Sequence, residues 1–501
     1  MASPDPLRNS SGWLSLPNVA GVVLLLAAAR LFIAARSGLV FDEGYYTFWS
    51  ERLATGYLDH PPAVAWLIAA GRALLGDHEL GVRVMAVACG VGASAAIWRI
   101  GVLLLDRSAA ALAVLLYNLT PAAGLGFLMT PDPPSALFWA ATLWAIAEAV
   151  ASGRAGWWLA AGALGGLGLW SKYTDAFLAP GVLLYLLSSA GPRRWLRRWQ
   201  VWAAPVVALA VFSPVVWWNA QRDWASFRFQ GQRTVTTGID PNWAGNFFDL
   251  LAGQSLYAAP ILVLLALAGL TWFFFRPGAP ERGELALAVW TTLPALAYFL
   301  FHALHGHVEA NWLIPLWPGL ALVAAVSLLG LGRASKWLGA AVFGVQAVIG
   351  IGLTLLVYVQ LLWQPIDLGG IDRTRETRGW AKLQRDIEAT AEANGAHWIA
   401  TAGNFGITGE LASYFLFAHS PLPVRQIDEP DRWQFLGPID PDTLGWPALY
   451  VALSANPPTD LFGKWQLVGT ATRDGGLHPI ERFSLMLVSQ PTAKFMAGIG
   501  K

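Results

Sequence analysis

The sequence predicts a polytopic α-helical membrane protein with a small C-terminal α/β domain, and three observations lead to this prediction. Of the 501 residues, 55% are hydrophobic and 13% are charged, which is about half the charged share of an ordinary soluble domain. Apolar runs of roughly 18–25 residues, long enough to cross a bilayer, recur along most of the chain. After about Gln364 such runs cease and charged residues become frequent.

The apolar runs predict about eleven membrane-spanning helices. The first run contains a stretch with the length of a secretory signal, but Arg30 and Arg36 interrupt the region where a signal would be cleaved. We therefore expect this run to stay as the first helix. The expected spans lie at about 17–36, 80–105, 109–127, 133–151, 157–170, 174–189, 202–219, 254–275, 285–304, 312–331 and 338–363.

The charge of the loops predicts the orientation, because the cytoplasmic loops of membrane proteins are enriched in Lys and Arg. One alternate set of loops carries most of the basic residues, and "GPRRWLRRWQ" is the clearest member of that set. The opposite set contains "FDEGYY", "LDHPP", "TPDPP", "WSKYTD" and "HGHVEANW". We therefore expect these five segments to share the outer side of the membrane, which is the periplasm in a Gram-negative cell.

An odd number of spans places the tail on the outer side as well. Apolar residues recur there at helical spacing in 378–396 and 407–418. Short apolar runs typical of strands lie at 397–403, 422–428, 448–453, 465–473 and 483–489. The predicted domains are a transmembrane domain, 1–364, with a first outer loop at about 37–79, and an extracytoplasmic α/β domain, 365–501.

Acidic residues stand in the outer loops, and each pattern has two interpretations. Asp42 and Glu43 lie close to Tyr45, directly after the first span. That pattern is typical of a helix boundary with interfacial aromatic residues, and also of a carboxylate that accepts a proton from a substrate hydroxyl. Asp132 precedes two prolines and is either a helix cap or a site residue.

Asp59 and His60 have the ligand types of a divalent metal site, with Glu43 as a third ligand, while a helix cap is the alternative interpretation. A divalent ion is the only cofactor that the sequence indicates. The sequence has no Walker motif and no GxGxxG after an expected strand, so a cytosolic nucleotide is not indicated. The single cysteine, Cys89, lies in an apolar run and is expected to be buried.

Basic residues on the outer side are candidates for binding an anion. Lys172, beside Tyr173, lies in a short outer loop where positive charge is less expected. It can hold an anionic headgroup as a point charge, or it can extend toward ordinary phospholipid. Glu309 and Asn311 precede another span and can bind a sugar or cap a helix. Arginines suited to bidentate phosphate contacts follow in the longer outer loop: Arg222, Arg228 and Arg233.

These motifs together resemble a known enzyme family. "FDEGYY", "YLDHPPAVAWL", "TPDPP", "SKYTD", "VEANWLIPLWP" and "ITGELASYFLF" extend over nearly the whole chain. They resemble C-type (GT-C) glycosyltransferases of the protein O-mannosyltransferase and aminoarabinose–lipid A transferase kind. The resemblance implies a GT-C fold and an inverting enzyme that moves a single sugar from a polyprenyl-phosphate donor. The implied acceptor is lipid A, another glycan or lipid, or a protein, and the implied location is the periplasmic face of a bacterial cytoplasmic membrane.

The resemblance also implies roles for residues. Asp42 matches the family's catalytic acid position, with Glu43 in support. The implied donor-phosphate ligands are Lys172, Tyr173, Arg222, Arg228 and Arg233. The implied acceptor or sugar ligands are Asp132, Glu309, Asn311 and Tyr45. One departure concerns His60, because the aminoarabinose transferases have a lysine before the paired prolines; the change favours metal binding with Asp59 over phosphate binding.

Two other classes of protein stay open at this point. A polytopic lipid or sugar transporter would place ionisable residues inside its spans near the midplane, often in repeated halves, whereas here they cluster at one interface. A ligase that transfers a whole glycan from a polyprenyl diphosphate often relies on a large outer loop rich in Arg and His, and the loop at 219–253 is only moderately so. The sequence predicts bilayer lipid as the surroundings and no nucleic-acid partner.

Overall fold

The computed structural model describes residues 12–234, 238–276, 281–453, 456, 458–476 and 478–499. The chain packs as two compact units. Unit 1 comprises residues 1–31, 60–63 and 86–355, and unit 2 comprises residues 32–59, 64–85 and 356–501. The second unit therefore contains most of the first expected outer loop as well as the C-terminal tail.

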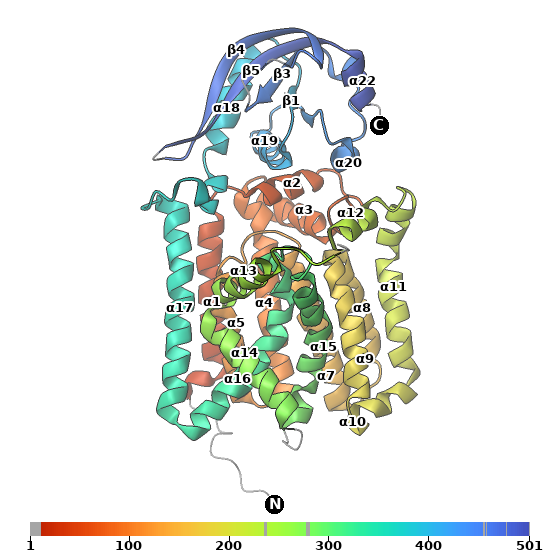
Figure 1. The fold of residues 1–501 in the computed structure, drawn as a ribbon, viewed down its shortest axis with the longest axis vertical. Coiled ribbons are helices and arrows are strands. Elements are labelled where there is room, and N and C mark those ends of the chain that lie inside the picture. The colour runs from red at the N-terminus through yellow and green to blue at the C-terminus, as the bar shows by residue number, and fades with distance from the viewer. Residues whose placement is uncertain are drawn as a thin grey trace, which may run out of the picture. The chain divides into compact units, whose positions relative to one another are not determined.

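Unit 1 is built from helices (Figure 1). Three of the long helices, α1, α4 and α17, contribute residues to both units. The long helices are α1 (Leu16–Ala34), α4 (Glu79–Leu104), α5 (Arg107–Asn118), α7 (Asp132–Ser152), α8 (Trp157–Ser171), α9 (Leu178–Leu187), α11 (Trp199–Ala220), α13 (Trp243–Ala258), α14 (Pro260–Phe275), α15 (Glu281–His302), α16 (Trp317–Ala334) and α17 (Lys336–Trp363). The short ones are η1 (Gly12–Leu14), α6 (Pro121–Gly124), η2 (Tyr173–Phe177), α10 (Ala190–Arg193), η3 (Arg194–Arg197), α12 (Ala225–Thr234) and η4 (Ala310–Leu316).

Within the described residues, seven helices are long and apolar enough to cross a membrane, or up to nine if each of two bent pairs is one span. The bent pairs are η2 and α9 with α10 and η3, and α13 with α14. This number is lower than the expected eleven. Two expected spans, at 109–127 and 157–170, correspond to α5 with 12 residues and α8 with 15 residues, which are shorter than the ~20 residues that a bilayer requires.

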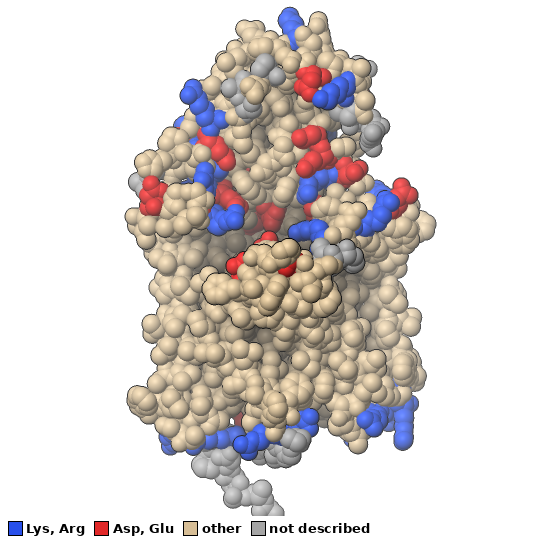
Figure 2. Space-filling model, in the orientation of Figure 1, with Lys and Arg blue, Asp and Glu red and all other residues tan. Residues whose placement is uncertain are grey.

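The helices of unit 1 pack closely where small residues face one another. Gly162 and Gly166 of α8 lie one turn apart, and a Cβ atom at either position would collide with α11. Spacing of this kind lets two helix backbones approach in a membrane protein. Figure 2 shows a broad uncharged surface across these helices, with Lys and Arg side chains gathered at the end where Figure 1 places α10. Such a surface suits contact with hydrocarbon.

Unit 2 contains a five-stranded sheet with the order β2-β1-β3-β5-β4. Strands β2, β1 and β3 are parallel, and β5 runs antiparallel to both β3 and β4. The five strands and two helices expected in the tail are all present. The strands are β1 (Ile399–Thr401), β2 (Val424–Gln426), β3 (Ala448–Ala452), β4 (Phe462–Asp474) and β5 (Pro479–Pro491). The tail helices are α18 (Trp380–Ala393), α19 (Phe405–Phe417), α20 (Pro430–Trp433), α21 (Pro441–Leu444) and α22 (Ala493–Ile499), with the single turns η5 (Gly369–Ile371), η6 (Arg373–Thr377) and η7 (Gln434–Leu436).

Two helices from the first expected outer loop, α2 (Phe41–Trp49) and α3 (Ala63–Leu75), complete the architecture. Helix α2 packs against α19 of the tail within unit 2. The sheet domain therefore forms part of the support for the segment that carries Asp42 and Glu43.

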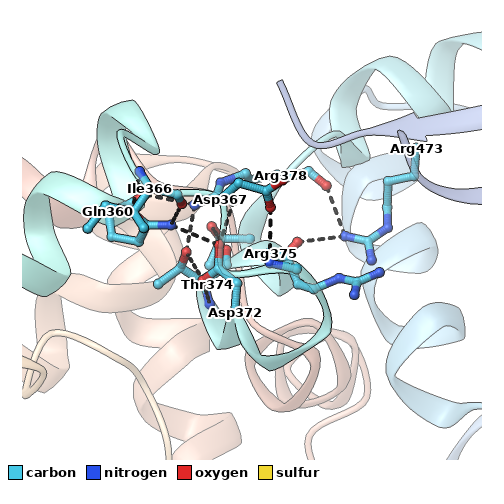
Figure 3. A network of polar contacts seen from close by, with 10 residues as sticks. Gln360, Ile366, Asp367, Asp372, Thr374, Arg375, Arg378 and Arg473 are labelled. Carbon is cyan, nitrogen blue, oxygen red and sulfur yellow. Dashed lines mark hydrogen bonds and ion pairs between the residues drawn. The ribbon is translucent and has the colours of Figure 1, made fainter. Parts of the chain in front are cut away.

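A polar network fixes the segment between α17 and α18 (Figure 3). Asp372 accepts hydrogen bonds from the backbone N and Oγ1 of Thr374 at 2.9 and 2.6 Å, and from Gln360 at 3.0 Å. Arg378 forms an ion pair with Asp372 at 3.2 Å. Arg473 of β4 donates to the carbonyl oxygens of Arg375 and Arg378. These bonds satisfy backbone groups in a segment that has little regular secondary structure of its own.

Candidate functional site

The acid pair lies in the first turn of α2, which begins at Phe41 after the extended residue Val40. The two carboxylates have different surroundings: Asp42 is exposed, whereas Glu43 is 0% exposed. Both benefit from the positive end of the helix dipole. Because of this difference in burial, only Asp42 presents a carboxylate to solvent or to a substrate.

Glu43 is held by Arg83, which lies in α4 and is also 0% exposed. The guanidinium donates to Oε1 at 2.8 Å and to Oε2 at 2.5 Å, a bidentate arrangement. Oε2 also accepts the backbone N–H of Val40 at 3.1 Å. The other donors of Arg83 reach backbone carbonyls, including those of Ser37 and Gly38, both at 2.6 Å. Glu43 and Arg83 therefore lock the start of α2 to the chain that leads into it.

Glu410 of α19 lies behind this pair and is 0% exposed. Within the described part of the chain, neither of its carboxyl oxygens has a hydrogen-bond partner. Burial, together with the negative charge of Glu43, raises its pKa well above the ordinary value for Glu. The carboxyl group of Glu410 is therefore harder to ionise than that of an ordinary glutamate, because a second negative charge beside Glu43 is unfavourable.

The backbones of α2 and α19 touch because both helices have glycine at the contact. A Cβ atom on Gly409 would lie 2.5 Å from the backbone N of Tyr45, and one on Gly44 would lie 2.8 Å from the backbone N of Glu410. Ser413 also donates a hydrogen bond to the carbonyl oxygen of Gly44 at 2.8 Å. The position of α2, and with it that of Asp42 within unit 2, depends on this close approach.

Tyr45 and Asp59 are bonded to each other and to the tail. Tyr45 donates to Oδ2 of Asp59 and to the carbonyl oxygen of Arg432, both at 3.0 Å. Arg432 forms an ion pair with Oδ1 of Asp59 at 2.6 Å and lies 4.4 Å from the ring centre of Phe405. Burial, followed by the charge of Asp59, raises the pKa of Tyr45. Both carboxylate oxygens of Asp59 are therefore occupied in holding the loop after α2.

In unit 1, the structure brings together three residues that the sequence singled out from distant segments. Lys172 pairs with Oδ1 of Asp132 at 2.6 Å, and Asn311 donates to Oδ2 of the same carboxylate at 2.8 Å. Asp132 is the first residue of α7, Lys172 follows α8, and Asn311 lies in η4. Lys172 and Asp132 are 7% and 4% exposed. The lysine charge is thus already balanced by one carboxylate.

Two further contacts extend this region of unit 1. Ser135 of α7 donates to Oδ1 of Asp175 at 2.5 Å, while Oδ2 of Asp175 is buried and has no partner within the described ranges. The Tyr173 hydroxyl lies 2.8 Å from that of Ser226 in α12, and the Tyr173 ring packs against that of Phe227. Tyr173 therefore fixes α12 beside η2.

The three arginines of the longer loop differ from Lys172 because all of them are exposed. Arg222 lies over the ring of Trp218 at 4.6 Å, and Arg233 lies over the ring of Phe229 at 5.9 Å. Glu309 is also exposed and lies 3.7 Å from His307. A set of accessible guanidinium groups is suited to holding a phosphate at a surface.

The structure does not support the expected metal site at Asp59 and His60 with a set of ligands among the described residues. The described residues contain no group of three or more His, Cys, Asp or Glu side chains that could hold a metal ion. Asp59 is engaged with Tyr45 and Arg432, and Glu43 is engaged with Arg83. The charges that the sequence suggested as ligands are thus balanced by arginine.

Four residues at these sites escaped the sequence interpretation: Arg83, Glu410, Arg432 and Asp175. An arginine within the apolar run at 80–105 is itself a signal, since a charge in a membrane segment is costly unless it is paired. The lone acid in "ITGELASYFLF" is a similar signal. Arg432 lies in an ordinary polar stretch, and no pattern there marks it.

Comparison with known proteins adds to this geometry. Residues 59–218 match the family described as dolichyl-phosphate-mannose-protein mannosyltransferase. The chain is 25% identical over 397 residues to the lipid A galacturonosyltransferase RgtD of Rhizobium johnstonii, covering 76% of this chain and 80% of that protein.

Solved structures share the fold. ArnT from Cupriavidus metallidurans, bound to undecaprenyl phosphate, matches with a TM-score of 0.63 and 17% identity, covering 94% of this chain and 98% of that one. The oligosaccharyltransferase of Archaeoglobus fulgidus matches with a TM-score of 0.51 and 13% identity, covering 88% and 70%. The chain has the GT-C fold, and these similarities support a glycosyltransferase.

In this glycosyltransferase, the matched family segment begins at Asp59 and includes Asp132 and Lys172. Helix α2, with Asp42 and Glu43, lies before the start of that segment. The geometry of α2 is therefore evidence about the site that the family match does not contain.

Proposed function

We propose that this glycosyltransferase moves one sugar from a polyprenyl-phosphate donor to a hydroxyl of a lipid A-type glycolipid at the outer face of the bacterial cytoplasmic membrane. The observation that carries the proposal is the division of the acid pair on α2. Glu43 forms a buried ion pair with Arg83, while Asp42 is exposed on the same helical turn. A solvent-exposed carboxylate fixed at a helix start has the properties of a general base.

In the proposed reaction Asp42 accepts the proton of the acceptor hydroxyl. The hydroxyl oxygen then forms a bond to the anomeric carbon, on the face opposite the bond from that carbon to the phosphate oxygen. The carbon–oxygen bond to the phosphate breaks, and the electron pair leaves with the polyprenyl phosphate. The anomeric configuration is inverted, and the proton remains on Asp42 until water removes it. No redox step and no covalent intermediate is needed.

The leaving phosphate gains negative charge as the bond breaks, so it requires cations rather than a strong acid. Lys172 and the exposed arginines Arg222, Arg228 and Arg233 in unit 1 are the groups that we assign to this role, with Tyr173 placing α12 through Ser226. Preorganised charges of this kind commonly contribute on the order of 100- to 1000-fold in rate. We assign Asp132 and Asn311 either to positioning Lys172 or to binding the sugar. We assign Glu309 to binding the sugar or the acceptor.

The nature of donor and acceptor is supported by the relatives. One relative is a lipid A galacturonosyltransferase, and a structure with the same fold contains undecaprenyl phosphate. The outer location is supported by the distribution of basic loops, of which the exposed segment around α10 and η3 is the clearest. A transporter or a glycan ligase remains the alternative that the experiment must exclude.

The test compares membranes from cells that lack this protein with membranes from cells complemented by the wild type, Asp42→Asn or Asp431→Asn. Asp431 is the matched control, because it is an exposed aspartate in the first turn of another helix of unit 2. Mass spectrometry follows polyprenyl phosphate sugars and the sugar content of lipid A, other glycans and proteins. We expect one donor to accumulate and one lipid A sugar to disappear, both in the absence of the protein and with Asp42→Asn, while Asp431→Asn restores both.

Unchanged donor and product pools in all strains would contradict transfer chemistry and favour transport. If the sugar disappears from protein rather than from lipid A, the proposed reaction stands, but the acceptor is a protein and not lipid A.

A further inference from the structure

Unit 2 contains a second polar site that the transfer reaction does not use. A cavity of about 240 Å³ lies between the end of α2, the end of α19 and the segment that leads into β2. Its volume is well above that of one water molecule, ~30 Å³, and below the range for drug-sized ligands, ~300–1,000 Å³. The cavity is thus of a size for a small polar group.

Two arginines line this cavity, and we call it the Arg52–Arg425 cavity. Arg425 is half-buried in β2, the edge strand of the sheet, and Arg52 lies in the turn after α2. Burial and the positive charge of Arg52 lower the pKa of Arg425. The positive charges of Arg52 and Arg425 therefore repel each other across the cavity.

Neither arginine has an acidic partner among the residues that the structure describes. The Nε atom of Arg425 is buried without a hydrogen-bond acceptor. Glu51 also lines the cavity, but its carboxylate pairs with Arg72, which in addition holds Asp77 at 2.7 Å. The acid nearest in sequence to Arg52 is therefore held by Arg72 rather than by Arg52.

An unpaired, partly buried guanidinium costs free energy unless a counter-charge reaches it. The remaining lining includes the aromatic residues Phe48 and Phe415 and the stiff segment Pro421–Pro423. Ser420 adds a hydroxyl group to the lining. Two guanidinium groups balance a doubly charged anion, and their planar donors match the oxygens of phosphate.

We propose that the Arg52–Arg425 cavity is a binding site for a phosphate monoester or inorganic phosphate. Both arginines contact the anion, and Ser420 donates a further hydrogen bond. The source of the phosphate is either the headgroup of a phosphorylated glycolipid, which rests on the proposed function, or the free ion.

The test measures binding to the full-length protein in nanodiscs of uncharged phosphatidylcholine by isothermal titration calorimetry with inorganic phosphate at constant ionic strength. A second arm titrates the protein with nanodiscs that contain diphosphoryl lipid A or its dephosphorylated form. Variants are Arg52→Gln, Arg425→Gln and the control Arg373→Gln, whose side chain is 94% exposed and lies outside the cavity. We expect at least a tenfold weaker affinity for the first two variants and no change for the control.

Binding of inorganic phosphate that depends on both arginines identifies the free ion as a ligand. Binding only of diphosphoryl lipid A, with the same dependence, identifies the lipid headgroup. Wild-type affinity in Arg52→Gln, whose exposed side chain can be replaced without disturbing the core, would overturn the proposal, as would the absence of binding in both arms. Because Asp42→Asn is expected to retain this binding, its result separates failure of the anion site from failure of the proposed reaction.

Discussion

Each unit of the molecule has a buried ion pair at the start of a helix. The two pairs differ in how many hydrogen-bond donors of the basic residue are already used within the protein. In unit 2, Arg83 donates to Glu43 and to the backbone carbonyls around Ser37, so its guanidinium is fully used. In unit 1, Lys172 has one contact, with Asp132, among the described residues. A lysine ammonium has three donor hydrogens, and the hydrogen bond to Asp132 uses one of them.

This difference separates a supporting pair from one that can take part in binding. In the Glu43–Arg83 pair the guanidinium has no donor left for a ligand, and the pair stabilises the turn on which Asp42 is exposed. The Asp132–Lys172 pair is satisfied in charge but not in hydrogen bonds, which suits a group that must receive and release a phosphate.

The largest effect on stability is expected for Arg83→Met. Removing one partner of a fully buried pair leaves Glu43 uncompensated, which costs about 3–5 kcal/mol in the free energy of unfolding. Thermal unfolding of the purified protein in detergent measures this loss. The control is Arg99→Gln, because the Arg99 side chain is 44% exposed in its pair with Glu148 and should cost less than ~1 kcal/mol. Equal unfolding temperatures for the two variants would show that the Glu43–Arg83 pair is not a support.

The second prediction concerns the double variant Lys172→Met with Asp132→Asn. Lys172→Met alone should be destabilised, since it leaves Asp132 buried without its counter-charge, and the second substitution should recover most of the lost stability. Transfer should nevertheless stay about 100- to 1000-fold below the wild type, because the cation for the phosphate is still missing. Sugar transfer and unfolding temperature are measured on the same preparations. If the double variant recovers both stability and transfer activity, the Asp132–Lys172 pair has only a structural role, like the Glu43–Arg83 pair of unit 2.

Gly409→Ala tests the support of α2 by α19. The new methyl group would meet the backbone N of Tyr45 at 2.5 Å, and overpacking of this kind commonly costs ~1–3 kcal/mol. Gly352→Ala in α17 is the matched control, since a Cβ atom there meets nothing within 4 Å. We expect a lower unfolding temperature for the first variant only; an unchanged value for Gly409→Ala would show that the two helices can separate at no cost.

The smallest effect is the pH dependence that Glu410 introduces. Its pKa is raised in the folded protein, so above the ordinary carboxyl pKa of ~4.3 the unfolded chain loses a proton that the folded chain keeps. Stability therefore falls as the pH rises toward the raised pKa, by at most ~1.4 kcal/mol per pH unit. Glu410→Gln should flatten this fall between pH 5 and pH 8. The same slope in both proteins would show that Glu410 is not the group responsible.

The fold could be predicted in large part from the sequence because its signals are local. Apolar length marks membrane helices, helical spacing marked α18 and α19 of the tail, and short apolar runs marked its five strands. The number of spans was harder to predict, because α5 has only 12 residues within the run at 109–127, and α8 has only 15 residues, fewer than the ~20 that a bilayer requires. Helix ends within an apolar run depend on packing rather than on composition.

The site was predictable only in its residue types. Asp132, Lys172 and Asn311 were identified separately, and the structure joins them in one cluster. The partners of Glu43 and Asp59 could not be predicted, because Arg83 and Arg432 lie 40 and 373 residues away in the chain. Long-range pairing also removes the expected metal ligands, since each of these acids is neutralised by an arginine that local patterns do not reveal.

The central claim is that Asp42, and not Glu43, performs the proton transfer. The most direct test is the initial rate of sugar transfer by purified Asp42→Asn and Asp431→Asn, with the donor and acceptor that the lipid profiles identify, together with the unfolding temperature of each. We expect wild-type unfolding temperatures for both variants and a rate about 100- to 10,000-fold lower for Asp42→Asn alone. An Asp42→Asn protein that is folded and transfers sugar at the wild-type rate would contradict this claim.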